Sequence, residues 1–135
     1  MKTLTDIIEK IFPVVNVSGV KTTLNGGKVY RYSKPNDSQL RDVVILGLPI
    51  TNDEDPITQS ATIIINCYAP NHVNGMSDDV NITTTIKAVI AALEAYTSGS
   101  TAYFEFVIQN QSIFKDFVDP AMSYGSMRVL CTIEN

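Results

Sequence analysis

The chain has 135 residues, a length that suits one folded domain, and we expect residues 1–135 to form a single domain. Apolar residues make up 44% of it, enough for a hydrophobic core. The formal net charge is −4 and the basic residues are scattered, so the basic patch with which nucleic-acid binders contact phosphates is missing. No stretch approaches the roughly 20 apolar residues of a membrane span, and no secretory signal is recognisable. We therefore expect a soluble cytoplasmic protein that binds neither nucleic acid nor membrane.

Residues 3–12 have the spacing of a short amphipathic helix. Thr3 and Asp6 are three residues apart, which is the spacing of a capping box at the helix start. We expect Pro13 to end the helix, because proline removes a backbone donor and disfavours helical geometry at the preceding residue. The apolar positions recur every three or four residues and so share one face: Leu4, Ile7, Ile8, Ile11 and Phe12.

The next segment, residues 14–28, is mixed. Valines could start a strand, but the Asn-Gly-Gly run at residues 25–27 interrupts the pattern. Asn-Gly favours positive backbone angles and a tight hairpin turn. We therefore predict a hairpin whose arms are residues 20–24 and 28–33, the second arm being the surer one.

Two apolar runs, residues 42–48 and 58–69, predict buried strands. A polar loop, residues 34–41, precedes the first run, and an acidic loop, residues 51–57, separates the two. Strict alternation in the second run places four side chains on one face of the predicted sheet: Ala61, Ile63, Ile65 and Cys67.

After a loop at residues 70–77, residues 78–97 predict the main helix. Ser77 or Asp78 is the expected cap, and the carboxylates of Asp78 and Asp79 favour the positive end of the helix dipole. One face of this helix is apolar: Ile82, Ile86, Val89, Ile90 and Leu93.

The last third predicts two strands, residues 101–109 and 124–134, joined by a longer connection at residues 110–123. Strands that follow one another without an intervening helix favour antiparallel pairing. We therefore expect an α+β fold, a mostly antiparallel sheet of about four to six strands with two helices on one face. The two helices are the N-terminal one and residues 78–97.

No motif in the chain points to an enzyme. The single histidine, His72, lies near Asp78 and Asp79, but an activated nucleophile in a recognisable context is missing, as is a G-x-S-x-G elbow. We interpret His72 as a solvated loop residue. Nothing in the sequence pairs Asp42 with Glu105 as general acid and base. We predict no catalytic residues.

Metal, phosphate and cofactor sites are not predicted either. The acidic residues 53–55 lack the ligand spacing of a calcium loop and are interpreted as a solvated loop, with weak divalent binding at an oligomer contact as the alternative. Residues 25–28 lack the Lys-Ser/Thr ending of a phosphate loop and are interpreted as a turn. Cys67 and Cys131 have no ligand-spaced neighbours, so we expect two buried, reduced thiols.

Tyrosines are the remaining feature. Tyr30, Tyr32, Tyr68 and Tyr103 lie on predicted strands with polar alternation. Exposed on one sheet face they would form a rigid contact surface, and otherwise they are half-buried sheet aromatics. The sequence leaves these two interpretations open.

The order of elements resembles that of the tail terminator or tail-completion proteins of long-tailed phages and prophages, over nearly the whole chain. Residues 13–28 are more turn-rich than that pattern, and residues 110–123 carry extra aromatics. The matching parts are the N-terminal helix and five sequence stretches: "VYRY", "DVVILG", "ATIIINCYA", "IKAVIAALEAY" and "SMRVLCTIE".

The resemblance implies a structural role in virion assembly, without catalysis. Such minor tail proteins form a ring, commonly a hexamer, on the head-proximal end of the tail tube, where they stop polymerisation and take part in head-tail joining. The implied partners are other copies of the chain, the tail tube and the head-connector proteins. The implied location is the host cytoplasm during assembly and the tail or neck of the virion.

The alternative is a small-molecule-binding or regulatory α+β module with a pocket between the main helix and the sheet. A hydrolase or transferase with a dispersed site is the weakest hypothesis.

Overall fold

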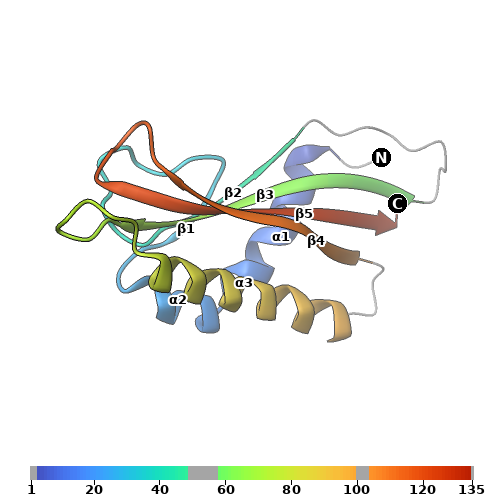
Figure 1. Cartoon of the computed structure of the whole chain (residues 1–135). Coiled ribbons are helices and arrows are strands. Elements are labelled where there is room, and N and C mark those ends of the chain that lie inside the picture. The colour runs from blue at the N-terminus through green and yellow to red at the C-terminus, as the bar shows by residue number, and fades with distance from the viewer. Residues whose placement is uncertain (1–2, 49–57, 100–103, 135) are drawn as a thin grey trace.

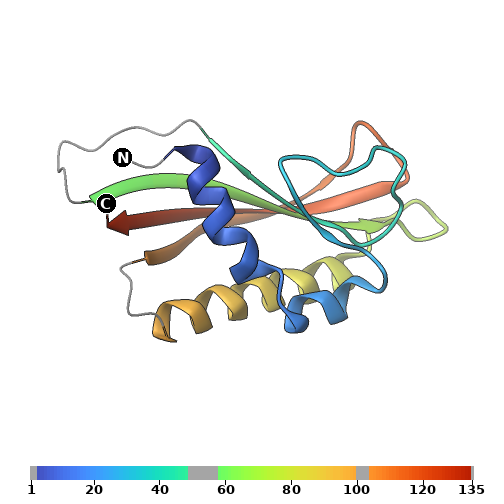
Figure 2. The same cartoon turned by 180° about the vertical axis from the view of Figure 1, so that it is seen from behind.

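The computed structural model describes residues 3–48, 58–99 and 104–134. Figures 1 and 2 show a long twisted sheet with its helices on one side. This is the α+β architecture that the sequence predicts. The acidic loop, residues 51–57, lies outside the described residues. The elements in chain order are α1 (Leu4–Val15), α2 (Ser18–Leu24), β1 (Val29–Arg31), β2 (Val43–Gly47), β3 (Thr58–Pro70), α3 (Asp79–Gly99), β4 (Phe104–Lys115) and β5 (Met122–Glu134).

Helix α1 begins as predicted and ends later than predicted. The Thr3 hydroxyl accepts a hydrogen bond from the Asp6 backbone N–H at 3.2 Å, and the Asp6 carboxylate accepts from the Thr3 N–H at 2.8 Å, which confirms the capping box. The prediction that Pro13 ends the helix is wrong, because the helix continues through it. Val14 and Val15 are buried, and their packing offsets the hydrogen bond that proline removes.

The predicted hairpin is wrong, because its first arm is a helix. Residues 20–24 belong to α2, whose Val20 and Leu24 share one face and are fully buried. Asn25 has φ 48° and Gly26 has φ 96°, so the Asn-Gly pair ends a helix in the left-handed conformation. The protein therefore has a third helix. The second arm is confirmed only as strand β1, which pairs with β2 instead of with residues 20–24.

The strand order in the sheet is β1-β2-β3-β5-β4. Only the β1-β2 pair is parallel, so the predicted mostly antiparallel sheet is confirmed. The predicted connection at residues 110–123 is too long, because residues 110–115 continue β4 and residues 122–123 begin β5. A bulge between Ile108 and Asn110 shifts the alternation of inward and outward side chains in β4. The polar residues beyond the bulge are exposed on an edge strand. For these two reasons the sequence of this segment lacks the alternating pattern that predicts a strand.

The core lies between the helices and one face of the sheet. The four predicted inward side chains of β3 are buried, and so are Ile82, Ile86 and Leu93 of α3. Close packing requires a glycine here: a Cβ at Gly125 of β5 would lie 2.6 Å from side-chain atoms of Ile82 and Ile86. The small-molecule alternative placed its pocket between α3 and the sheet, and the packing at this crossing is dense.

Both cysteines are free and buried in this core, as predicted. Burial raises the pKa of the Cys67 thiol to about 12, and it raises the pKa of the Cys131 thiol to about 12 as well. Both thiols are therefore protonated at ordinary pH, and neither has the reactivity of a thiolate.

Candidate interaction surfaces

His72 lies beside the start of α3. Its Nε2 atom lies 3.7 Å from Oδ1 of Asp78, and its side chain is largely exposed. Asp78 caps α3: its carboxylate accepts a hydrogen bond from the Asn81 backbone N–H at 3.3 Å and another from the Asn81 side chain. Burial raises the pKa of Asp78, but the Asn81 hydrogen bonds, helped by the charges of His72 and Arg41, bring that pKa below its ordinary value. The predicted cap is confirmed.

Asp42 has a structural task. Its carboxylate is fully buried and accepts hydrogen bonds from the Lys28 backbone N–H at 2.9 Å and from the Ser38 hydroxyl at 2.5 Å. These bonds join the residue before β1 and the loop after β1 to the start of β2. The side chain of Glu105 and the acidic residues 53–55 lie outside the described residues. Within residues 3–48, 58–99 and 104–134, no cluster of His, Cys, Asp or Glu could hold a metal ion, and no helix there is long and apolar enough to span a bilayer.

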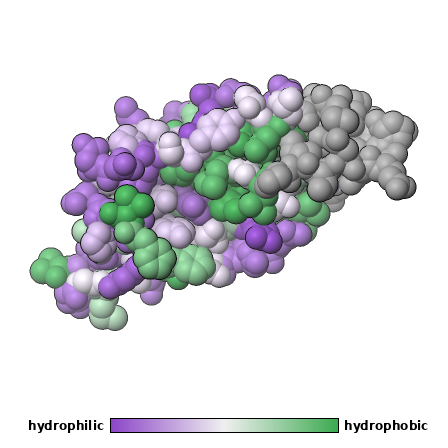
Figure 3. Space-filling view, turned by 90° about the horizontal axis from the view of Figure 1, so that it is seen from above, coloured by the Kyte–Doolittle hydropathy of each residue, from purple (hydrophilic) through white to green (hydrophobic). Residues whose placement is uncertain are grey.

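The sheet face turned away from the helices carries apolar and aromatic side chains. Figure 3 shows apolar residues gathered over its central strands. Leu46 of β2 is paired with Ile64 of β3, and both are only partly buried. Leu130 of β5 lies on the neighbouring strand and is also partly buried. This face is therefore less polar than a sheet face in contact with water usually is.

An aromatic cluster continues this face toward the β4–β5 turn. The rings of Tyr68 and Tyr124 are 5.1 Å apart, and the ring of Phe114 is 5.7 Å from that of Tyr124. The Lys34 ammonium lies 4.9 Å from the centre of the Tyr68 ring. Burial, followed by the negative charge of Asp116, raises the pKa of Tyr68. Tyr68 is therefore a partly buried residue that packs against its aromatic neighbour on this sheet face.

The other tyrosines divide between the two interpretations left open by the sequence. Tyr32 is 46% exposed and has φ 68°, and Tyr30 is partly buried in β1. Tyr103 lies outside the described residues. The sequence did not identify Tyr124 and Phe114 as members of the cluster. Tyr124 and Phe114 lie opposite each other on β5 and β4, and this strand pairing would have identified their contact. The pairing was not recognised because residue 114 was assigned to a loop.

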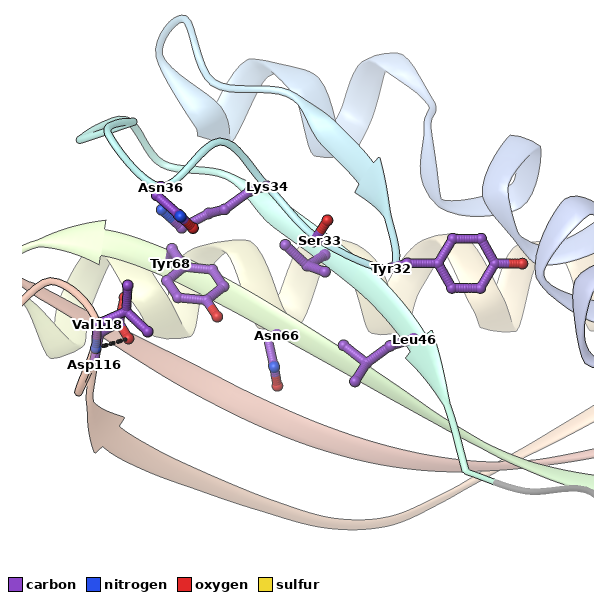
Figure 4. Close-up of a pocket in the computed structure, with 10 residues that line it drawn as sticks. Tyr32, Ser33, Lys34, Asn36, Leu46, Asn66, Tyr68, Asp116 and Val118 are labelled. Carbon is purple, nitrogen blue, oxygen red and sulfur yellow. Dashed lines mark hydrogen bonds between the residues drawn. The ribbon is translucent and has the colours of Figure 1, made fainter.

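A pocket of about 220 Å³ opens beside this cluster (Figure 4). One buried oxygen in it, Oδ1 of Asn66, has no hydrogen-bond partner in the part of the chain that is described. The volume lies below the roughly 300–1,000 Å³ of ordinary ligand pockets. The pocket is lined by Tyr32, Ser33, Lys34, Asn36, Val44, Leu46, Asn66, Tyr68, Asp116 and Val118.

A larger groove of about 540 Å³ runs between the C-terminal part of α1 and the C-terminal half of α3, which Figure 2 shows crossing each other. Lys10 is the one charged residue that lines it. The other lining residues are apolar or aromatic: Pro13, Val14, Val17, Ala92, Ala95 and Tyr96.

Exposed apolar side chains gather at the end of the sheet where β3 leads to α3 and β4 turns into β5. These two connections touch, because the Asn71 backbone N–H donates to the Ala121 carbonyl at 2.8 Å and the Asn71 side chain donates to the Pro120 carbonyl at 3.1 Å. We call this region the apolar end, and it is defined by Val73, Met76, Val80, Phe117 and Val118. Groups of exposed apolar residues of this kind mark interaction sites.

Comparisons with known proteins address the fold. No family model and no curated protein matches the chain. Among solved structures, a chain of the virion of a native gene transfer agent particle matches with a TM-score of 0.67 and 13% identity, over 93% of this chain and 92% of that one. The gp17 protein of bacteriophage SPP1 matches with a TM-score of 0.52 and 16% identity, over 98% of this chain and 89% of that one.

The α+β fold of this chain is therefore one that also occurs in a virion particle and in a bacteriophage protein. Both matches run over almost the whole length of the chains, so the likeness concerns the complete arrangement of helices and sheet. At these low identities it concerns the fold alone.

Proposed function

We propose that the chain is a structural tail-assembly protein of a phage or prophage, of the tail-terminator or tail-completion type. The observation that carries the proposal is the whole-length fold match to a chain of a gene transfer agent virion and to a bacteriophage protein. The sequence resemblance to tail terminators rests on separate grounds, namely the order of the elements and the quoted stretches. Both lines of reasoning support a protein of a phage-type particle.

The mechanism is assembly through surfaces, with no chemical step. Copies of the chain form a ring, commonly a hexamer in the resembling family, which caps the tail tube and joins it to the head. A ring needs a heterologous interface whose rotation closes on itself. Charged residues are only 18% of the chain, and its apolar end, groove and uncovered sheet face are suited to such contacts. The negative net charge favours passage of DNA through the ring.

The proposed partners are further copies of the chain, the tail tube protein and the head connector. The proposed location is the host cytoplasm during assembly and afterwards the tail or neck of the particle. His72 is an exposed loop residue, Asp78 caps α3, and Asp42 holds neighbouring segments together by hydrogen bonds. A non-catalytic role fits these structural roles.

Two measurements test the proposal. The first is size-exclusion chromatography with light scattering over a wide concentration range. The second is electron microscopy of tail tubes polymerised from their tube protein with and without the chain. We expect oligomers at high concentration, and a ring at one end of tubes whose growth has stopped. A strict monomer that leaves tube length and tube ends unchanged would contradict the proposed function.

A further inference from the structure

The β4–β5 turn presents two apolar side chains to solvent on a well-ordered support. Phe117 is 98% exposed and Val118 is 72% exposed. The Asp116 carboxylate accepts a hydrogen bond from the Val118 backbone N–H at 3.0 Å, and the Asp119 carboxylate accepts one from the Ala121 N–H at 3.1 Å. These bonds fix the turn before any partner arrives, which lowers the entropic cost of binding.

In the described part of the chain these two side chains are not packed against other elements. The turn lies at the end of the sheet, whereas the groove is lined by residues of α1 and α3, which Figure 2 shows in the helix layer. The chain thus has an apolar projection and an apolar groove at two separate places. This arrangement is that of a heterologous interface, in which each copy offers a different surface to each of its two neighbours.

The charges of the two surfaces are complementary. The turn carries two carboxylates, Asp116 and Asp119, next to one basic residue, Lys115. The groove is lined by Lys10 and by no acidic residue. A volume of about 540 Å³ lies within the roughly 300–1,000 Å³ range of pockets that hold compact apolar groups.

We propose that the turn at Phe117 and Val118 of one copy inserts into the α1–α3 groove of the next copy, with its carboxylates near Lys10. This inference rests on the proposed ring function and assigns the contact between neighbouring copies that builds the ring. Repetition of the contact gives a closed ring if the rotation between copies closes, and a filament if it does not.

The contact is expected to be weak for a single pair of copies. Burying a phenylalanine side chain contributes about 1.5–3 kcal/mol, and 1.4 kcal/mol is a tenfold change in Kd. We therefore expect Phe117→Ser to weaken self-association roughly 10- to 100-fold. Phe117 is almost fully exposed, so the substitution leaves the folded core unchanged. The matched control is Leu40→Ser, which removes an apolar side chain that is 48% exposed and lies outside the apolar end, the groove and the sheet face.

Disulfide trapping between two variants tests the geometry directly. One variant carries Phe117→Cys and the other carries Ala95→Cys, which places a thiol in the groove. The two are mixed under a mild oxidant and separated by non-reducing electrophoresis. The native Cys67 and Cys131 are buried, and burial raises the pKa of each thiol to about 12, so they do not compete. The control mixture pairs Leu40→Cys with Ala95→Cys.

We expect cross-linked dimers from the first mixture at several times the control yield. A chain that carries both Phe117→Cys and Ala95→Cys should give a ladder that ends at the ring size. If the wild-type chain forms oligomers or caps tubes but the two mixtures cross-link equally, or Phe117→Ser self-associates normally, the inference is overturned and the proposed function stands. The inference is equally overturned if Phe117→Cys cross-links only to cysteine-bearing tail tube protein. A wild-type chain that neither oligomerises nor caps tubes overturns the proposed function itself.

Discussion

The replacement of Gly27 by alanine tests the close approach between the segment before β1 and the segment before β2. A Cβ atom at Gly27 would lie 1.8 Å from the backbone oxygen of Arg41 and 3.0 Å from Oδ1 of Asp42. The first contact is with backbone, which no side-chain rotation relieves. The two segments must therefore move apart.

The expected loss of stability follows from the hydrogen bonds at this crossing. The Lys28 N–H donates to the buried Asp42 carboxylate at 2.9 Å, and the Val43 N–H donates to the Lys28 carbonyl at 3.0 Å. A hydrogen bond to a charged group contributes about 1.5–3 kcal/mol and a neutral one about 1 kcal/mol, so we expect a loss of about 2.5–4 kcal/mol. With an unfolding entropy of roughly 2.1 cal/mol/K per residue, this loss lowers the Tm of a 135-residue chain by about 9–14 °C.

Thermal and urea unfolding of Gly27→Ala, followed by circular dichroism, measure this loss. The matched control is Gly19→Ala in α2, where an added Cβ meets no atom within 4 Å. There we expect no loss and a gain of up to about 1 kcal/mol, because alanine favours the helix. If Gly27→Ala unfolds within about 1 kcal/mol of the wild type, the steric reasoning is refuted.

Three further predictions concern single side chains. Asp78→Ala removes the cap of α3 and should cost about 0.5–2 kcal/mol at pH 7. Because folding lowers the pKa of Asp78, its carboxylate stabilises above the unfolded pKa of about 3.9 and loses this effect as pH falls through the folded pKa. Urea unfolding should therefore show a smaller difference between variant and wild type at pH 3 than at pH 7, and an equal difference would contradict the assignment. A thiol reagent at pH 8 should leave Cys67 and Cys131 unlabelled in the native protein and label both after denaturation, and rapid native labelling would show that the core opens. His72→Ala should change stability by less than about 0.5 kcal/mol and leave tube capping intact, and loss of capping would give this loop a direct role.

The sequence predicted the elements whose pattern comes from one-sided burial. The alternation from Ala61 to Cys67 placed β3 and identified its buried face, and the same reasoning placed α3. Thr3 and Asp6 identified the start of α1 because a capping box depends on residues only three positions apart. These signals are local, so they can be read without knowledge of the partner elements.

The sequence failed where the same residues suit two local structures. The Asn-Gly pair at residues 25–26 favours left-handed backbone angles, and both a hairpin turn and a helix end use them. Only the burial of Val20 and Leu24 decides for a helix. Pro13 remains in α1 because the residues that follow it are buried. Helix propensity considers only the proline itself and does not include this burial.

The candidate surfaces were predicted only in part. The sequence identified Tyr68 as a candidate contact residue and noted extra aromatics in residues 110–123, but it assigned that segment to a connection. The ring partner of Tyr68 is Tyr124 of β5, which in turn contacts Phe114 of β4, and the pairing of these distant strands brings the three rings together. The exposure of Phe117 depends on how the β4–β5 turn is held, which the sequence does not state.

The sequence by itself determined the buried faces of β3 and α3, the absence of a recognisable catalytic motif and the order of elements that resembles tail terminators. These properties follow from residue spacing and residue type, which act over a few positions. The tertiary structure decided that residues 18–24 form a helix, that β1 runs parallel to β2, and that α1 and α3 leave a groove while the β4–β5 turn projects an exposed phenylalanine. Each of these depends on contacts between segments far apart in the chain, because burial and exposure are set by what packs against a residue in space.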